Sequence, residues 1–224
     1  MRRRVVLTCL VAPAALAGPP AAAQSVGMAL IDASARGDLA AATQALAAGT
    51  PLEARDASGR TALLAATQGG HAALARWLIE RGADVNAQDA IQDSAFLLAG
   101  ARGHTEIVLA AHPKADPRVL NRYGGTALIP ACHHGHVDTV RALLEWKGAN
   151  RVPIDHVNRL GWTALLEAVI LGDGGPRHTE IVRLLIAHGA NVNLADREGL
   201  TPLAHARQRR QETIVALLQR AGAR

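Results

Sequence analysis

Apolar residues recur along the chain at helical spacing, in pairs of short segments separated by polar turns. In one such pair, Leu63 and Ala66 are followed by Leu74 and Leu78. Spacings of three and four residues place apolar side chains on one face of a helix, so this pattern predicts two short amphipathic helices. Because neither helix can bury its apolar face alone, we expect successive pairs to stack against one another.

A short motif recurs ahead of these helix pairs. It contains Asp or Asn, a Gly three residues later and a Thr two residues after the Gly, and 89–96 is a degraded copy with Ser94 in place of Thr. The complete copies are 56–63, 121–128, 158–165 and 196–203. Successive Thr or Ser positions are 33, 32, 37 and 38 residues apart. Each Thr can cap a helix by accepting a backbone N–H, and a period of this length indicates a stacked-repeat protein.

Further downstream, a Gly-His pair and a closing GADVN-like segment also recur. The Gly-His pairs are at 70–71, 103–104 and 135–136, and the closing segments are at 82–86 and 189–193. Together the motifs resemble the ankyrin repeat, whose signature is G-x-TPLHxAA, then GH, a paired-Leu helix and GADVN. The resemblance implies an all-α fold, an ankyrin-repeat solenoid of about six stacked helix-turn-helix repeats with short hairpin loops.

The repeat domain is expected to cover 30–224. Its first unit lacks the Gly-x-Thr motif and is interpreted as an N-terminal cap, and the polar residues at 207–211 suit a solvent-facing C-terminal cap. Pro113 and Pro117 are expected to end the second helix of the third repeat early. The predicted repeats are 30–55, 56–88, 89–120, 121–157, 158–195 and 196–222. The His of TPLH is replaced in every copy, so apolar packing must take over its role, and the replacing residues are Leu64, Leu97, Ile129, Leu166 and Ala204.

The first residues are typical of an export signal. Three arginines at 2–4 precede an apolar stretch at 5–17 that is too short to span a bilayer, and the small residues at 21–23 fit a cleavage site. We therefore expect a signal peptide at 1–23 and a short linker at 24–29, with a buried N-terminal helix as the alternative. The chain then resembles bacterial exported single-domain ankyrin repeat proteins, which implies a periplasmic or secreted location.

Composition changes this interpretation little. Of the 224 residues, 49% are hydrophobic but only 2% are aromatic, which favours helices packed through small side chains. The formal charge of +5 includes the three signal-peptide arginines, so the remainder carries about +2 and gives weak support for nucleic-acid binding. Cys132 alone remains after signal cleavage, so no intrachain disulfide is expected.

No motif for catalysis is present: G-x-S-x-G, H-E-x-x-H and the phosphate-binding G-x-x-x-x-G-K-[ST] are all missing from the sequence. The ankyrin resemblance also implies a protein without enzymatic activity or cofactor. Cys132, His133 and His134 form one metal-like cluster, since thiolate and imidazole suit Zn²⁺ or Cu⁺. His136 belongs to a Gly-His pair, and adjacent helical residues diverge by roughly 100°, so a packed Cys beside exposed His residues is the competing interpretation.

In ankyrin repeats the binding face is usually concave and is formed by hairpin tips and first-helix residues. Tyr, Trp and Arg most often dominate interface energies, and here such residues gather in the fourth and fifth repeats. A Trp162 side chain folded back onto the neighbouring repeat is the alternative. The predicted partner-binding residues are Arg122, Tyr123, His133, His134, Arg159, Leu160, Trp162, Ile170 and Leu171.

Two segments exceed the repeat length, at 150–156 and 172–176. We expect Leu171 to end a first helix, Thr179 to begin the second, and His178 to be a displaced copy of the Gly-His histidine. The insertions either form a shaped rim around the binding face or have drifted without function, since loops tolerate added residues cheaply.

These features predict a monomeric, non-catalytic protein-binding module, a scaffold or stabilising accessory for an envelope protein. Neither nucleic-acid binding nor membrane insertion after signal cleavage is expected. An inhibitor or immunity protein is one alternative, and a metal-binding protein that uses Cys132, His133 and His134 is another.

Overall fold

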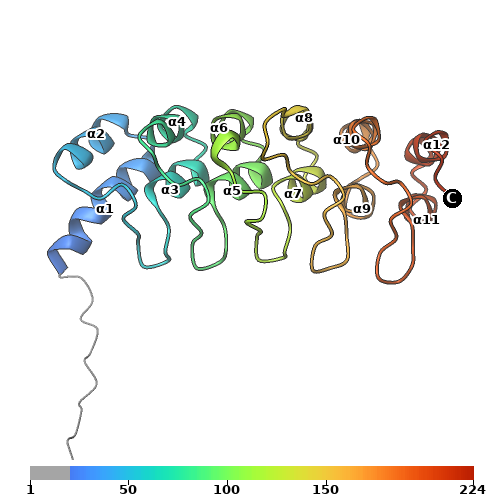
Figure 1. Cartoon of the computed structure of the whole chain (residues 1–224), viewed down its shortest axis with the longest axis horizontal. Helices are drawn as coiled ribbons and strands as arrows, with labels where there is room; N and C mark the ends of the chain where they lie inside the picture. The colour runs from blue at the N-terminus through green and yellow to red at the C-terminus, as the bar shows by residue number, and fades with distance from the viewer. Residues whose placement is uncertain (1–20) are drawn as a thin grey trace, which may run out of the picture.

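The protein is a single row of stacked helix pairs (Figure 1). The structure is a computed structural model that describes the backbone of residues 21–224 and the side chains of residues 28–224. No strand occurs in this part of the chain, so the all-α prediction is confirmed. The helix pairs are α1 (Ala21–Arg36) and α2 (Leu39–Ala47), α3 (Ala62–Gln68) and α4 (Ala72–Glu80), α5 (Ala95–Arg102) and α6 (Thr105–Ala111), α7 (Leu128–His133) and α8 (Val137–Glu145), α9 (Ala164–Ile170) and α10 (Pro176–Ala187), and α11 (Pro202–Gln208) and α12 (Glu212–Arg220).

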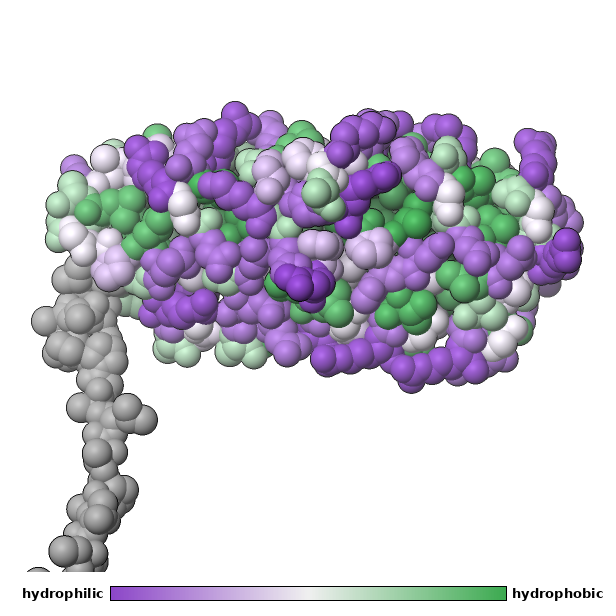
Figure 2. Space-filling view, in the orientation of Figure 1, coloured by the Kyte–Doolittle hydropathy of each residue, from purple (hydrophilic) through white to green (hydrophobic). Residues whose placement is uncertain are grey.

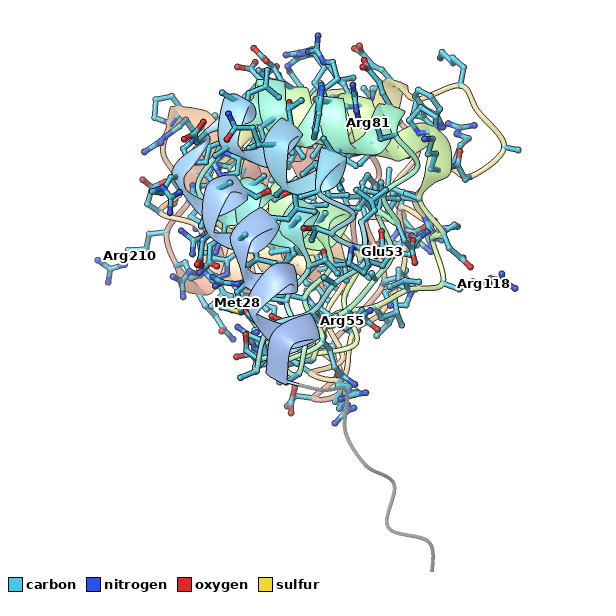
Figure 3. The ribbon with its side chains drawn as sticks, turned by 90° about the vertical axis from the view of Figure 1, so that its left-hand side faces the viewer. Met28, Glu53, Arg55, Arg81, Arg118 and Arg210 are labelled. Atoms are coloured by element: carbon cyan, nitrogen blue, oxygen red, sulfur yellow. The ribbon has the colours of Figure 1, made fainter. Side chains whose placement is uncertain are left out.

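The first helix of each pair lies in one row and the second helix in another, and hairpin loops extend from the first row on the side away from the second (Figure 1). From one end of the stack, Arg118 and Arg210 project on opposite sides (Figure 3). Arg210 marks the turns inside the helix pairs, and Arg118 marks the loops that lead into the hairpins. On the face shown in Figure 2, apolar patches lie between polar side chains.

The N-terminal segment departs from the expected linker. Residues 24–29 lie within α1, which also includes 21–23 from the predicted signal peptide. The helix α1 packs against both α2 and α3. The rest of the predicted signal peptide, 1–20, lies outside the described residues. Among those described, no helix combines the length and apolar character needed to cross a membrane.

Helix capping follows the sequence motif in four of the five copies. The side-chain oxygens of Thr61, Ser94, Thr163 and Thr201 each accept a backbone N–H from the residue three positions on, over 3.2–3.3 Å. In the fourth repeat the prediction is wrong: the helix begins at Leu128, and the buried Thr126 Oγ1 has no hydrogen-bond partner. Pro130 lacks the N–H that bonds to the capping residue's carbonyl in the other copies, so the first backbone hydrogen bond of this helix is missing.

Histidines in the turns join successive repeats. Nε2 of His71 and His136 lies 3.1 and 3.2 Å from a carbonyl oxygen of the preceding repeat. His178 makes the same contact with the His133 carbonyl at 2.9 Å, as expected for a displaced Gly-His histidine. In the last repeat Gln211 replaces the histidine and donates to the Val169 carbonyl at 3.1 Å. Arg210 before it has a φ of 56°, the left-handed conformation that glycine adopts in the other turns.

Apolar side chains fill the position of the missing TPLH histidine. Leu64, Leu97, Ile129 and Leu166 are all buried, so packing replaces the lost hydrogen bonds as expected. In the third repeat, α6 ends at Ala111 and a 3₁₀ turn, η1 (His112–Lys114), contains Pro113. The predicted early end of this helix is confirmed.

Candidate partner-binding groove

A pocket of about 790 Å³ is formed by the hairpin loops and first helices of repeats three, four and five. Its lining combines apolar residues with charged and histidine side chains. Six of the nine predicted partner-binding residues line it, namely Arg122, Tyr123, His133, His134, Leu160 and Leu171. The structure therefore brings together residues that lie up to 49 positions apart in the sequence.

The other three predicted residues, Arg159, Trp162 and Ile170, do not line the pocket. Trp162 and Ile170 are partly buried. Arg159 is exposed and connects two hairpins, since its Nη1 donates to the Arg122 carbonyl at 2.9 Å and its backbone N to the Tyr123 carbonyl at 2.8 Å. The structure thus gives Arg159 a role in holding the hairpin tips together.

The mouth of the pocket exposes unusually large apolar side chains. Tyr123, Leu160 and Leu171 are 54%, 47% and 40% exposed. The Arg122 guanidinium lies over the Tyr123 ring at 5.3 Å, and its Nη1 is 3.4 Å from Asp93 Oδ2. Burial raises the pKa of Asp93, although the charge of Arg122 opposes the shift. An aromatic ring, a cation and two leucines together form a surface of the kind that proteins use for recognition.

Glu167, at the floor of the pocket, was missed by sequence reasoning. Its side chain is only 7% exposed, and Oε1 accepts a hydrogen bond from Asn158 Nδ2 at 3.0 Å. Burial raises the pKa of Glu167 to about 7, against the opposing effect of the Asn158 hydrogen bond. The sequence does carry a signal: Glu167 is the x of TPLHxAA, where the three preceding repeats have Ala65, Leu98 and Pro130.

Histidines line the pocket at the end of α7 and in the turn that follows it. The His133 and His134 rings are stacked with centroids 4.2 Å apart, and the His136 ring is 5.8 Å from His134. Burial lowers the pKa of both His133 and His136. Since these two rings lose their proton more readily than a free histidine, they add little positive charge near neutral pH.

The metal-binding alternative meets an unfavourable geometry. Cys132 is fully buried, and burial raises the pKa of its thiol well above the usual value, whereas a metal requires the thiolate. In the part of the chain that the structure describes, no group of three His, Cys, Asp or Glu is arranged to hold a metal ion. Cys132 is therefore a packing residue beside partly exposed histidines.

The two insertions do not form a rim around this pocket. Residues 172–176 are missing from its lining, and 151–154 line a separate, smaller pocket of about 330 Å³ with Leu143, Leu144 and His188. The helix α10 begins at Pro176 and not at Thr179 as expected, because proline is favoured in a first helical turn. Asp173 Oδ1 lies 2.7 Å from His178 Nδ1, so the 172–176 loop orients the histidine that joins repeats four and five.

Comparison with known proteins agrees with the motif analysis. Family models for ankyrin repeats match residues 95–175 and 154–224, and a single-repeat model matches 58–90. A crystal structure of an ankyrin repeat domain from Acinetobacter baumannii AYE is 50% identical, with a TM-score of 0.81, over 87% of this chain and 98% of that one. The ankyrin repeat domain of Bcl-3, a member of the IkappaB family, is 28% identical with a TM-score of 0.75, over 88% of this chain and 86% of that one.

Among curated proteins, the putative ankyrin repeat protein YahD of Escherichia coli strain K12 is 45% identical over 117 residues, which is 52% of this chain and 56% of that protein. The chain spans at most about half the length of the curated relatives it matches. Members of this family are generally interaction modules without catalytic activity. The motifs, the stacked helix pairs and these matches together show that the chain belongs to the ankyrin repeat family.

Proposed function

We propose that this protein is a non-catalytic binding module whose pocket in repeats three to five docks a partner protein. The exposed Tyr123, Leu160 and Leu171 at the pocket mouth support this most strongly. Large apolar side chains gathered on a surface raise the free energy of the solvated protein, and a partner that covers them lowers it. Ankyrin repeats mediate protein binding, and the mixture of ring, cation and leucines here suits a protein surface.

The biological setting we propose is the bacterial periplasm or the exterior, where a monomer of this protein serves as a scaffold or stabilising accessory for an envelope protein. The three arginines and apolar stretch at the start of the sequence support export. The near-balanced charge of the remaining chain argues against nucleic acid as the partner.

A second candidate role is inhibition of the partner. One relative, the NF-kappa-B inhibitor cactus of Drosophila melanogaster, is 32% identical over 111 residues, although the match covers only 22% of that protein. An inhibitory role predicts that the captured partner is an enzyme or toxin whose activity falls when this chain is added. A scaffold predicts instead that the partner's abundance falls when this chain is removed.

Quantitative capture from envelope extract tests the proposed site. The wild-type chain is compared with a Tyr123→Ala/Leu160→Ala variant, and both substitutions replace exposed side chains and so leave the core intact. Leu109→Ala on α6 is the matched control, since Leu109 is 50% exposed and does not line the pocket. We expect the double variant to lose the partner and the control to retain it. Equal capture by all three proteins contradicts the site.

A further inference from the structure

We propose that the pocket recognises a basic side chain, arginine or lysine, presented by the partner protein, and that the Glu167 carboxylate at the pocket floor forms its ion pair. This inference rests on the proposed function and names the chemistry of the partner. It is argued from the charge balance inside the pocket and from the apolar walls that lead to its floor.

Glu167 lacks a compensating cation. In the described part of the chain, no Lys or Arg forms an ion pair with its carboxyl group. The Asn158 amide that bonds to Oε1 is neutral, and the nearest basic atom is His133 Nδ1, 3.6 Å from Oε2. A buried carboxylate without a cation is costly, so a partner that supplies positive charge gains the energy of an ion pair at a site that the chain itself leaves incomplete.

The groups that surround Glu167 do not remove this imbalance. On α7, burial lowers the pKa of His133, which keeps its ring neutral near pH 7, and burial raises the pKa of the Cys132 thiol, which keeps it uncharged. From α10, His178 Nε2 contacts the His133 backbone carbonyl, and its Nδ1 lies against Asp173. The hairpin contributes only the Asn158 amide.

The other carboxylate of the pocket already has a partner. Asp93 lies 3.4 Å from Arg122, whose guanidinium also covers the Tyr123 ring. A basic side chain of the partner is therefore expected to pair with Glu167, which has no cationic partner, and not with Asp93, which already has one. Since Arg102 and Arg122 also line the mouth, an acidic segment could be drawn there, but it would bring a second negative charge toward the buried carboxylate.

The walls of the pocket suit the long stem of a basic side chain. Ile129, Leu160, Leu171 and the Tyr123 ring contribute apolar surface to the same pocket as Glu167. Arginine and lysine bury their methylene groups against apolar surfaces while the charged end reaches a polar partner. A volume of about 790 Å³ exceeds one side chain, so neighbouring residues of the partner segment also fit.

Two matched pentapeptides test the inference. One is acetyl-Gly-Leu-Arg-Leu-Gly-amide, and the other carries citrulline, which keeps the shape of arginine and loses its charge. Both are titrated into the isotope-labelled full chain, and the NMR shifts of Tyr123, Leu160 and Glu167 are followed. We expect saturable shifts with the arginine peptide and at least tenfold weaker binding of the citrulline peptide. Glu167→Gln is expected to lose at least tenfold in affinity, whereas Glu80→Gln on α4, an exposed Glu outside the pocket, binds as the wild type does.

The pH dependence supplies a second readout. Because Glu167 ionises with a pKa of about 7, the affinity for the arginine peptide should rise about 30-fold from pH 5.5 to pH 8, and this rise should be absent in Glu167→Gln. Equal shifts at Tyr123 and Leu160 with both peptides would overturn the inference that the pocket recognises a basic side chain. They would still support the pocket as a peptide-binding site. Absence of any shift with the arginine peptide also overturns it, and the capture experiment then decides separately whether the groove binds protein.

Discussion

Repeats five and six place polar pairs at the same two positions but balance their charges differently. In repeat six, His205 on α11 lies 2.6 Å from Asp196 in the hairpin. In repeat five, the equivalent positions hold Glu167 on α9 and the neutral Asn158. The two hairpins share the same backbone hydrogen bonds, and the pairs differ in the chemistry of their side chains. In repeat six the Asp196 carboxyl group has a basic side chain as its partner. In repeat five the buried Glu167 carboxyl group has a neutral amide instead.

The pKa values of the two carboxyl groups follow this difference. Burial raises the pKa of Asp196, but hydrogen bonds from His205 and from the backbone N–H of Leu200 and Glu198 outweigh it, so the net pKa is lowered. For Glu167 burial outweighs the one hydrogen bond from Asn158, and the pKa rises to about 7. The Asp196–His205 pair, in which an acid faces a base, is thus interpreted as a structural element. The Glu167–Asn158 pair, in which the acid lacks a basic partner, marks a candidate recognition site.

The largest expected effect is stabilisation by Glu167→Gln at alkaline pH. The folded state holds its proton up to about pH 7 and the unfolded state only to about 4.5, so the wild type loses stability as the pH rises through this window. Glutamine keeps the Asn158 contact without the charge. We expect the variant to be more stable by about 3 kcal/mol at pH 8 and nearly equal at pH 4.5. Urea unfolding at both pH values measures this, and equal stability at pH 8 contradicts an uncompensated acid.

The next effect is a loss of stability as the pH falls, which is opposite in direction to the Glu167 effect. It comes from His112, a second buried titratable group without a charged partner. Its ring is stacked on Trp146 at 4.6 Å, neither ring nitrogen has a hydrogen-bond partner, and burial lowers its pKa to about 4. Below pH 6.5 the unfolded state takes up a proton that the folded state refuses, so stability falls as the pH falls. Between pH 6.5 and 5 we expect a loss of about 2 kcal/mol.

Since the His112 and Glu167 windows overlap and oppose each other, the loss is best measured by unfolding in the Glu167→Gln background. His112→Phe in that background is the control, which should remove the dependence. If the free energy of unfolding of the His112→Phe control still falls as the pH falls, the dependence belongs to another titratable group.

A smaller effect tests the balanced pair of repeat six. His205→Gln removes the imidazole beside Asp196 but leaves the backbone hydrogen bonds that Asp196 accepts from Leu200 and Glu198. We expect a loss of about 1.5 kcal/mol at pH 6, opposite in sign to Glu167→Gln at high pH. Chemical unfolding of the two variants side by side measures the contrast. If both substitutions change stability in the same direction, the charge comparison between the repeats fails.

The smallest effect extends the comparison to the caps. Thr163 Oγ1 accepts the Leu166 N–H at 3.2 Å, whereas Thr126 Oγ1 is buried without a partner. We expect Thr163→Val to cost about 1 kcal/mol and Thr126→Val to be neutral or slightly stabilising. The free energies of unfolding of the two variants give the answer, and a cost at Thr126 equal to that at Thr163 would show that it caps α7 after all.

The sequence predicts the repeats well because each one carries its own local signals. The capping residue keeps its place in the motif, and Thr61 and Thr163 cap their helices as expected. Departures have local causes too, since Pro130 removes the first backbone hydrogen bond of the fourth repeat's first helix and Pro176 starts α10 early.

The pocket could be predicted only in part, because local sequence signals do not show which side chains the stacked repeats bury. Tyr123 and Leu160 could be placed from their hairpin positions, because the repeat motif fixes where each hairpin lies. The surroundings of Glu167 include His133 of the preceding repeat as well as Asn158 of its own, and no single motif describes both. Its raised pKa is therefore a property of the stack and becomes visible only in the folded structure.

The most direct test is the pKa of Glu167, measured from its side-chain carboxyl ¹³C shift in the full chain between pH 4 and pH 9. A midpoint near 7, with Asp196 titrating below 3.8, is the result we predict for an uncompensated acid beside a balanced pair. A Glu167 midpoint near 4.5 would contradict the claim, because the carboxyl would then be solvated or already paired.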